Sequence, residues 1–300
     1  MIVTSFDSLI CPLDNHPLQR AGASWRCASG HTFDVAREGY IHLLPVQNKR
    51  SRDPGDSKEM VAARRRFLGA GCYLPIAAAV SRAVLRNFRT DAAPGAILSC
   101  LDAGCGEGYY LRELVAASGD IDSLPTSLLS LIGLDISKWA VLSAAKQDKQ
   151  MCWVVGSNAN LPVESHSLDC VLCMFGFPVY AEFLRVLKPG GLLLQVDSGP
   201  DHLRELREII YPTLKAERTE EVPVPDGFER RSEERESAET VRFSLDLRGQ
   251  EQIGDLLAMT PHLYRATAEG RARAAALTSL VVTVDARLTI LRVPVSQPQC

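Results

Sequence analysis

The sequence reads Leu101-Asp102-Ala103-Gly104-Cys105-Gly106-Glu107-Gly108 between an apolar, strand-like run and a stretch with helical periodicity. Glycines at such a junction let the backbone approach a ligand closely, and the N-terminus of the following helix then faces that ligand. The spacing is Gly-x-Gly-x-Gly, whereas the loop that packs a dinucleotide pyrophosphate has the wider Gly-x-Gly-x-x-Gly. A nicotinamide-dependent Rossmann oxidoreductase, the main competing class, also needs a catalytic Tyr-Lys pair or His, and we find neither in the sequence.

From Ile97 onward, short apolar runs alternate with helical stretches, which is typical of a parallel α/β sheet with helices on both faces. Two later segments rich in β-branched residues add an antiparallel hairpin, with helical residues 250–275 between them. The chain should therefore form a seven-stranded, mostly parallel, Rossmann-like sheet, with a highly charged surface excursion at residues 213–239. We predict strands at Ile97–Asp102, Leu131–Asp135, Met151–Val155, Leu168–Met174, Leu192–Val196, Val241–Leu247 and Leu280–Val293, and helices near Tyr109–Ala117, Lys138–Gln147, Tyr180–Leu187 and His202–Tyr211.

The composition is that of an ordinary globular protein: of 300 residues, 46% are hydrophobic and 23% charged. This length suits one catalytic domain with an accessory module, and we place the boundaries at residues 1–60 for the module, 61–95 for a helical connector and 96–300 for the catalytic domain. We find no signal-peptide pattern and no long apolar run, so we expect a cytoplasmic protein without a membrane partner. The nine cysteines are scattered and odd in number, which favours reduced thiols.

The N-terminal part carries an excess of positive charge. Residues 1–90 hold 13 Lys and Arg against 7 Asp and Glu, although the whole chain has a net charge of −3. Such asymmetry is typical of an anion-binding surface, and a solvated basic face is the competing interpretation.

Cys11-x-x-Asp14 and Cys27-x-x-x-His31 have the two-knuckle spacing of a structural zinc site. Asp14 stands where a second cysteine is usual, and a carboxylate oxygen is also a zinc ligand; His16 is an alternative. The competing interpretation is a loop that folds without metal and buries two small thiols.

The glycine loop and the residues after it resemble the cofactor site of class I S-adenosylmethionine-dependent methyltransferases. Asp135 ends the second strand, where the family has an acid that binds both ribose hydroxyls. Ser157 and Asn158 end the third strand, where the family contacts adenine, and Lys188–Gly191 matches the turn before the fifth strand. Taken singly, each residue also fits a turn, a cap or a solvated strand end. The cofactor contacts that this resemblance implies are Asp102, Gly104, Gly106, Asp135, Ser157 and Asn158.

Over essentially the whole chain, the sequence also resembles the 23S ribosomal RNA guanine-N1 methyltransferases. The resemblance implies zinc ligands at Cys11, Asp14, Cys27 and His31, and further cofactor contacts at Tyr73, Glu107, Gly108 and His202. It also implies a homodimer whose N-terminal module and methyltransferase domain form a cleft for an rRNA hairpin. The matching stretches are His31–Val46, Lys49–Ser57, Ala63-Arg64, Phe67-Leu68, Asp102–Tyr110, Gly133–Lys138 and Gly199–Leu203.

We therefore expect methyl transfer to N1 of a guanine in a hairpin loop of 23S rRNA. The sequence does not identify the base that removes the N1 proton. Phe175 and Phe177 are candidates for the walls of the base pocket, or else ordinary core or lid aromatics, in a segment that departs from the family. The alternatives are a methyltransferase with another substrate and a non-catalytic, cofactor-binding RNA chaperone or ribosome assembly factor. RNA phosphates should meet the densest basic run, formed by Lys49, Arg50, Arg52, Arg64, Arg65 and Arg66.

Overall fold

The computed structural model describes residues 2–48, 51, 53–91, 96–119, 128–214, 223–230 and 238–295. Three members of the expected basic run, Lys49, Arg50 and Arg52, lie outside the described residues. So do parts of the charged excursion at residues 213–239.

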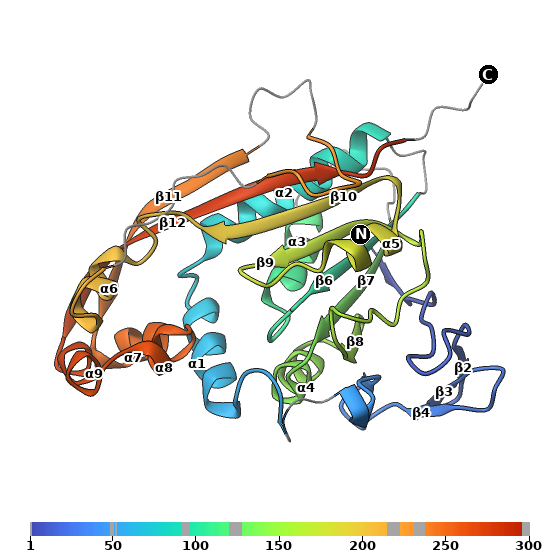
Figure 1. The fold of residues 1–300 in the computed structure, drawn as a ribbon, viewed down its shortest axis with the longest axis horizontal. Helices are drawn as coiled ribbons and strands as arrows, with labels where there is room; N and C mark the ends of the chain where they lie inside the picture. Colours follow the sequence, from blue (N-terminus) through green and yellow to red (C-terminus); the bar gives the residue numbers. More distant parts are fainter. Residues whose placement is uncertain are drawn as a thin grey trace.

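The central sheet contains all seven strands predicted from the sequence, in the order β11-β12-β10-β9-β6-β7-β8. In chain order, the first five of these strands, β6 to β10, pair in parallel, and the last two, β11 and β12, form the expected antiparallel hairpin (Figure 1). The fifth strand begins at Leu187, five residues earlier than predicted, because Lys188–Gly191 forms an irregularity within the strand. The bounds are β6 (Ile97–Ala103), β7 (Leu128–Asp135), β8 (Cys152–Val155), β9 (Leu168–Met174), β10 (Leu187–Ser198), β11 (Ala238–Arg248) and β12 (Ser279–Arg292).

The N-terminal part adds two strands to this sheet, which therefore has nine. β1 (Ile2–Thr4) pairs in parallel with β7, and β5 (Tyr40–His42) pairs in parallel with β8 at the edge. A separate three-stranded sheet holds β2 (Gln19–Ala21), β3 (Ser24–Arg26) and β4 (Thr32–Asp34), followed after β5 by the short helix η1 (Val46–Asn48). Figure 1 shows this small sheet beside the edge that carries β8.

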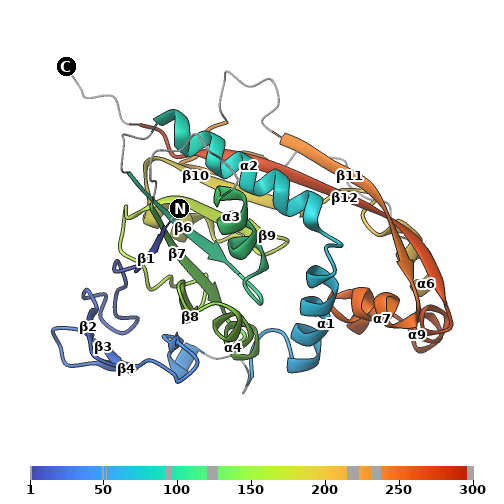
Figure 2. The same cartoon turned by 180° about the vertical axis from the view of Figure 1, so that it is seen from behind.

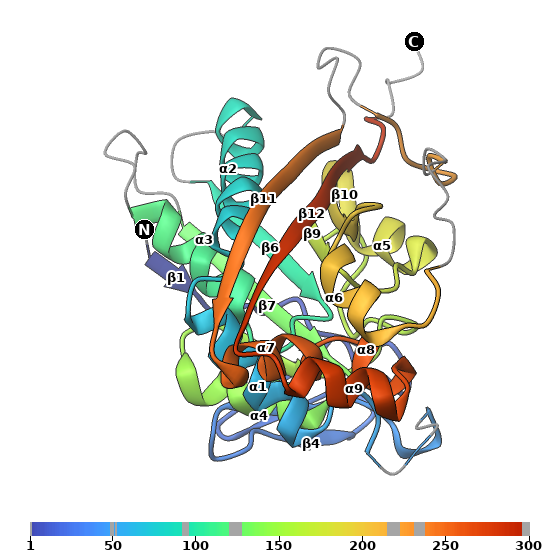
Figure 3. The same ribbon diagram turned by 90° about the vertical axis from the view of Figure 1, so that its left-hand side faces the viewer.

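Helices cover both faces of the large sheet. α2 (Leu74–Asp91), α3 (Tyr109–Gly119) and α4 (Lys138–Gln147) lie on one face, and α5 (Tyr180–Val186) lies on the other (Figures 2 and 3). The ends of α3, α4 and α5 agree with the predicted helices to within two residues. Ser137 is the N-cap of α4, where its hydroxyl accepts a hydrogen bond from the backbone N–H of Ala140.

A helical arm lies at the end of the long β11–β12 hairpin (Figure 3). Its helices are α6 (Arg204–Ile210), α7 (Gln250–Ala258), α8 (His262–Arg265) and α9 (Ala268–Ala275), so the predicted helical residues 250–275 form three short helices. The arm packs against α1 (Lys58–Gly69). Within the described residues no single helix is long and apolar enough to cross a membrane; α1 and α2 meet that test only as a pair bent by 80°.

Trp153 on β8 fixes the glycine loop against the sheet. Its side chain is fully buried, and its indole N–H donates to the carbonyl of Asp148 at 2.8 Å. The ring lies against Gly108 and against Gly133 of β7, and at both positions a Cβ atom would overlap it. Glycine is thus required at two positions by one aromatic ring.

Candidate functional site

The glycine loop leaves the carboxyl end of β6 and leads into α3. Gly104, Gly106 and Gly108 have φ values of +97°, +56° and +82°, which favour glycine. The backbone N–H groups of Gly104 and Cys105 donate to the carbonyl of Leu134 at 2.8 and 2.9 Å. The loop is therefore held at the carboxyl edge of the sheet, where ligands of open α/β sheets bind.

Asp135 ends β7 and is tied to this loop. Its Oδ2 accepts from the backbone N–H of Gly106 at 2.9 Å, and its Oδ1 accepts from that of Ser137 at 2.7 Å. Burial raises the pKa of Asp135, while the two N–H donors act in the opposite direction. The carboxylate is thus held in one orientation next to the glycines.

Asp102, at the end of β6, is fully buried, and neither of its carboxyl oxygens has a hydrogen-bond partner among the described residues. Burial, together with the charge of Asp135, raises its pKa to about 8. Asn158 follows β8 and donates to the carbonyl of Ala103 at 3.4 Å, whereas its Oδ1 is buried without a partner.

Buried polar atoms without partners are costly, so their concentration at this edge indicates a polar ligand. S-adenosylmethionine fits this set of acceptors, because its ribose hydroxyls, ammonium group and adenine amino group can donate hydrogen bonds to them.

Tyr73, His202 and Phe175 form an aromatic cluster. The ring centroid of Phe175 lies 6.0 Å from that of Tyr73 and 5.6 Å from that of His202. Burial lowers the pKa of His202 to about 4, so its imidazole is neutral at pH 7.

The hydrogen bonds of His202 show which nitrogen of its neutral ring carries the proton. Its Nδ1 accepts from the backbone N–H of Asp285 at 3.2 Å, so in the neutral ring the proton is on Nε2. Nε2 lies 3.2 Å from the Tyr73 oxygen and donates to it. Tyr73 therefore keeps its own O–H to donate elsewhere, and burial raises its pKa, which keeps it a phenol.

Three other residues expected at the site, Glu107, Ser157 and Phe177, differ from one another in their surroundings. Both carboxylate oxygens of Glu107 accept from Arg112, at 3.0 and 2.8 Å, and the side chain is only 1% exposed. Ser157 accepts from the backbone N–H of Ala159 at 3.2 Å. Phe177 is 89% exposed, so the two expected pocket aromatics do not share one environment.

The four expected zinc ligands, Cys11, Asp14, Cys27 and His31, come together, with all ligand atoms within 4.8 Å of one another. His31 Nδ1 lies 3.4 Å from each Sγ and 3.0 Å from Asp14 Oδ2, and Cys27 Sγ lies 3.5 Å from the same oxygen. Tetrahedral zinc with bonds of about 2.0–2.3 Å separates its ligand atoms by about 3.5 Å, so the set fits zinc. The alternative ligand His16 contacts Asp14 and Ser29 and is not part of this group.

The described part of the basic run does not form one free face. Arg64 pairs with Asp56 and donates to the carbonyl of Met259, and Arg66 makes two bonds to Asp255 of α7. Arg65 is exposed. The sequence could not reveal the contacts with Met259 and Asp255, because these partners lie about 190 positions away along the chain.

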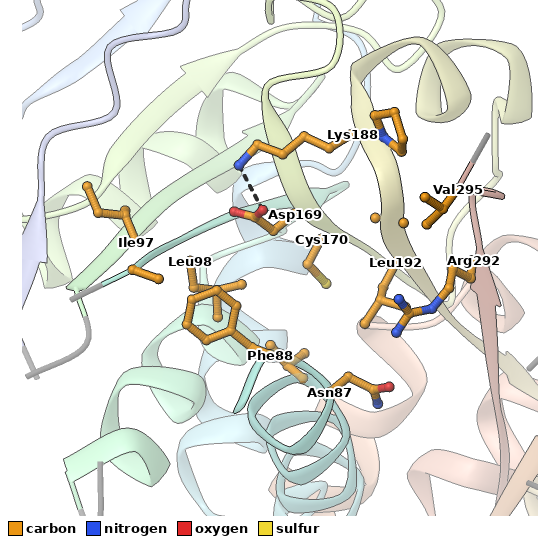
Figure 4. Close-up of a pocket in the computed structure, with 15 residues that line it drawn as sticks. Asn87, Phe88, Ile97, Leu98, Asp169, Cys170, Lys188, Leu192, Arg292 and Val295 are labelled. Atoms are coloured by element: carbon orange, nitrogen blue, oxygen red, sulfur yellow. Dashed lines mark hydrogen bonds and ion pairs between the residues drawn. The ribbon is translucent and has the colours of Figure 1, made fainter. Parts of the chain in front are cut away.

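A cavity of about 610 Å³ lies at the opposite edge of the sheet, between α2 and the first residues of β6, β9 and β10 (Figure 4). Lys188 and Asp169 form an ion pair of 2.7 Å in its wall. Because it is at the amino ends of the parallel strands, it is not the cofactor site.

The parallel sheet, the glycine loop and the acid that ends the next strand define a class I S-adenosylmethionine-dependent methyltransferase, with a zinc-ribbon module before it. The family models agree: residues 9–52 match the N-terminal zinc ribbon described as "RlmA, N-terminal", and residues 101–195 match a methyltransferase domain.

Three curated relatives are similar over most of the chain. One from Micromonospora griseorubida, provisionally named a 23S rRNA (guanine-N1)-methyltransferase, is 34% identical over 95% of this chain and 96% of its own length. A second relative, from Bacillus subtilis, has the same provisional name and is 34% identical over 69% of this chain and 70% of its own length. The 23S rRNA (guanine(748)-N1)-methyltransferase of Streptomyces fradiae is 35% identical over 66% of each chain. The chain belongs to the 23S rRNA (guanine-N1)-methyltransferase family.

Proposed function

We propose that this protein transfers the methyl group of S-adenosylmethionine to N1 of a guanine in a hairpin loop of 23S rRNA. The observation that carries the proposal is the carboxyl edge of the sheet, with Asp135 bonded to the glycine loop and Asp102 buried without partners, in a chain similar to such enzymes over 95% of its length. The other cofactor contacts that we propose are Tyr73, Gly104, Gly106, Gly108, Asn158 and His202, with Glu107 and Ser157 contributing through their backbone.

When bound, the cofactor supplies an activated methyl group. The residues of this chain must hold the guanine in line with it, and such positioning is worth several kcal/mol of the barrier. Neutral guanine carries hydrogen on N1, so a base or a water must take this proton. We propose that Phe175, packed against Tyr73 and His202, forms one wall of the base pocket. The exposed Phe177 offers a ring on which an extruded base can stack.

We propose that residues 1–60 form the RNA-binding module, residues 61–95 the connector and residues 96–300 the catalytic domain. Cys11, Asp14, Cys27 and His31 would hold zinc, which would keep the knuckles of the module together. Lys49, Arg50, Arg52 and Arg65 would contact RNA phosphates. The protein would act as a cytoplasmic homodimer.

Methyl transfer from labelled cofactor to unmodified 23S rRNA tests the proposal. We expect incorporation with the wild type and none with Asp135→Ala. Cofactor binding without any transfer would instead support a non-catalytic RNA chaperone or assembly factor, and transfer to another substrate alone would overturn the rRNA assignment.

A further inference from the structure

We propose that the guanidinium of Arg64 binds the carboxylate at the amino-acid end of S-adenosylmethionine. Arg64 is then a cofactor-binding residue and not part of the RNA-binding surface. This inference rests on the proposed function for the identity of the ligand.

The position of Arg64 is the first argument. Arg64 is on α1 but reaches the glycine loop, where a Cβ atom on Gly106 would lie 3.4 Å from Nη1 and 3.7 Å from Cδ of Arg64. Its charge also acts on Asp135 and Tyr73, at both of which it opposes the rise in pKa caused by burial. The guanidinium therefore lies among the residues proposed to hold the cofactor.

The charges around the loop are the second argument. Asp56 and Asp135 are acidic, and they suit the hydroxyl and ammonium groups of the cofactor but would repel its carboxylate. Arg112 also contacts the loop, but its guanidinium pairs with both oxygens of the buried Glu107. The side chain of Arg64 is 25% exposed, so a ligand at the loop can reach it.

The third argument is the unused hydrogen-bonding capacity of Arg64. A guanidinium has five N–H groups in a fork that matches a carboxylate. The described contacts of Arg64 are one bond to Asp56 and one of 3.0 Å to the carbonyl of Met259, so further N–H groups are available to a ligand. The Tyr73 O–H, which is not used toward His202, is a second donor in the same region.

The two existing contacts orient the guanidinium before any ligand binds. Asp56 belongs to a strap whose Gly55 packs against Ser137, and the Ser137 hydroxyl donates to the Asp56 carbonyl at 2.6 Å. Preorganisation of this kind lowers the cost of binding.

Calorimetry with two ligands tests the inference. S-adenosylhomocysteine has the amino-acid carboxylate, whereas 5′-methylthioadenosine has the same nucleoside without it. We expect Arg64→Ala to lower the affinity for S-adenosylhomocysteine about 10- to 100-fold, because a charged hydrogen bond is lost. The affinity for methylthioadenosine should change less than about 2-fold. Arg64→Lys should recover part of the loss.

A matched variant separates ligand binding from structural effects. Arg66→Ala removes a neighbouring arginine of α1 that pairs with Asp255. It should retain most of the affinity for S-adenosylhomocysteine. An equal loss for both ligands in Arg64→Ala, no loss at all, or the same selective loss in Arg66→Ala would overturn the inference. Failure of the wild type to bind S-adenosylhomocysteine would overturn the proposed function instead.

Discussion

Two carboxylates, Asp102 and Asp135, end neighbouring strands of the sheet but have opposite hydrogen-bonding environments. Asp135 accepts two backbone N–H groups, whereas Asp102 has no partner among the described residues. Their places near the carboxyl ends of two strands were predictable from sequence, because each comes at the end of an apolar run. The contacts of Arg64 and Glu107 were not, because side-chain pairing depends on tertiary packing that local patterns do not encode.

Asp135→Ala should lower the affinity for S-adenosylhomocysteine more than about 100-fold, because the ribose acceptor is lost and the Gly106 N–H loses its partner. Gly106→Arg should do the same by filling the loop, where φ is +56°. Calorimetry measures the affinity, and circular dichroism checks that both variants fold. Wild-type affinity in folded Asp135→Ala would remove this carboxylate from the site.

The raised pKa of Asp102 predicts a pH dependence of stability in the cofactor-free protein. Between pH 4 and about 8, Asp102 is protonated in the folded state but ionised in the unfolded state, so the free energy of unfolding falls as pH rises. The contribution is roughly 5 kcal/mol across this window. Urea unfolding of Asp102→Asn, which cannot ionise, should show a smaller decrease with pH than the wild type. Parallel curves for the two proteins would contradict the pKa assignment.

At the scale of elements, the helices and long strands followed from periodicity, and α4 was predicted to the residue. β1 and β5 were missed because three residues are too few to show a period of two. The zinc knuckles were predictable from spacing, and the structure brings the four ligands together even though Asp14 replaces a cysteine.

The replacement of a soft thiolate by a hard oxygen should weaken zinc binding. We expect zinc in protein purified without chelators, and Asp14→Cys should hold it more tightly in competition with a chelator. Removal of the metal should impair RNA binding but leave cofactor affinity unchanged. Zinc in the variant alone would mean that the wild-type site has been lost, and zinc in neither protein would refute the ligand set.

On α1, Arg65 and Arg66 should behave differently toward RNA. Both arginines are exposed, but the guanidinium of Arg66 is already bonded to Asp255. Arg65→Ala should lower the slope of log affinity against log salt by about one, since each phosphate contact contributes about that much. Arg66→Ala is the matched control and should leave the slope unchanged. Filter binding across a salt series decides this, and equal slopes for Arg65→Ala and the wild type would assign Arg65 to the solvated surface.

At the scale of the whole molecule, the N-terminal part and the catalytic sheet are joined by two strand pairings, β1 with β7 and β5 with β8. A further bond, from the Ile10 N–H to the Pro162 carbonyl, links the zinc knuckle to the loop after β8. Composition and charge predicted an accessory module but not these pairings, because they join segments more than a hundred residues apart. The zinc module and the cofactor edge are therefore connected through β8.

The identity of the methylated atom tests the central claim most directly. Unmodified 23S rRNA is incubated with the protein and labelled cofactor, digested to nucleosides and analysed by mass spectrometry, and the position is mapped by the arrest of reverse transcription at the modified base. We predict 1-methylguanosine at a single hairpin-loop position, absent with Asp135→Ala. Label in another nucleoside, or in guanine at an atom other than N1, would contradict the account.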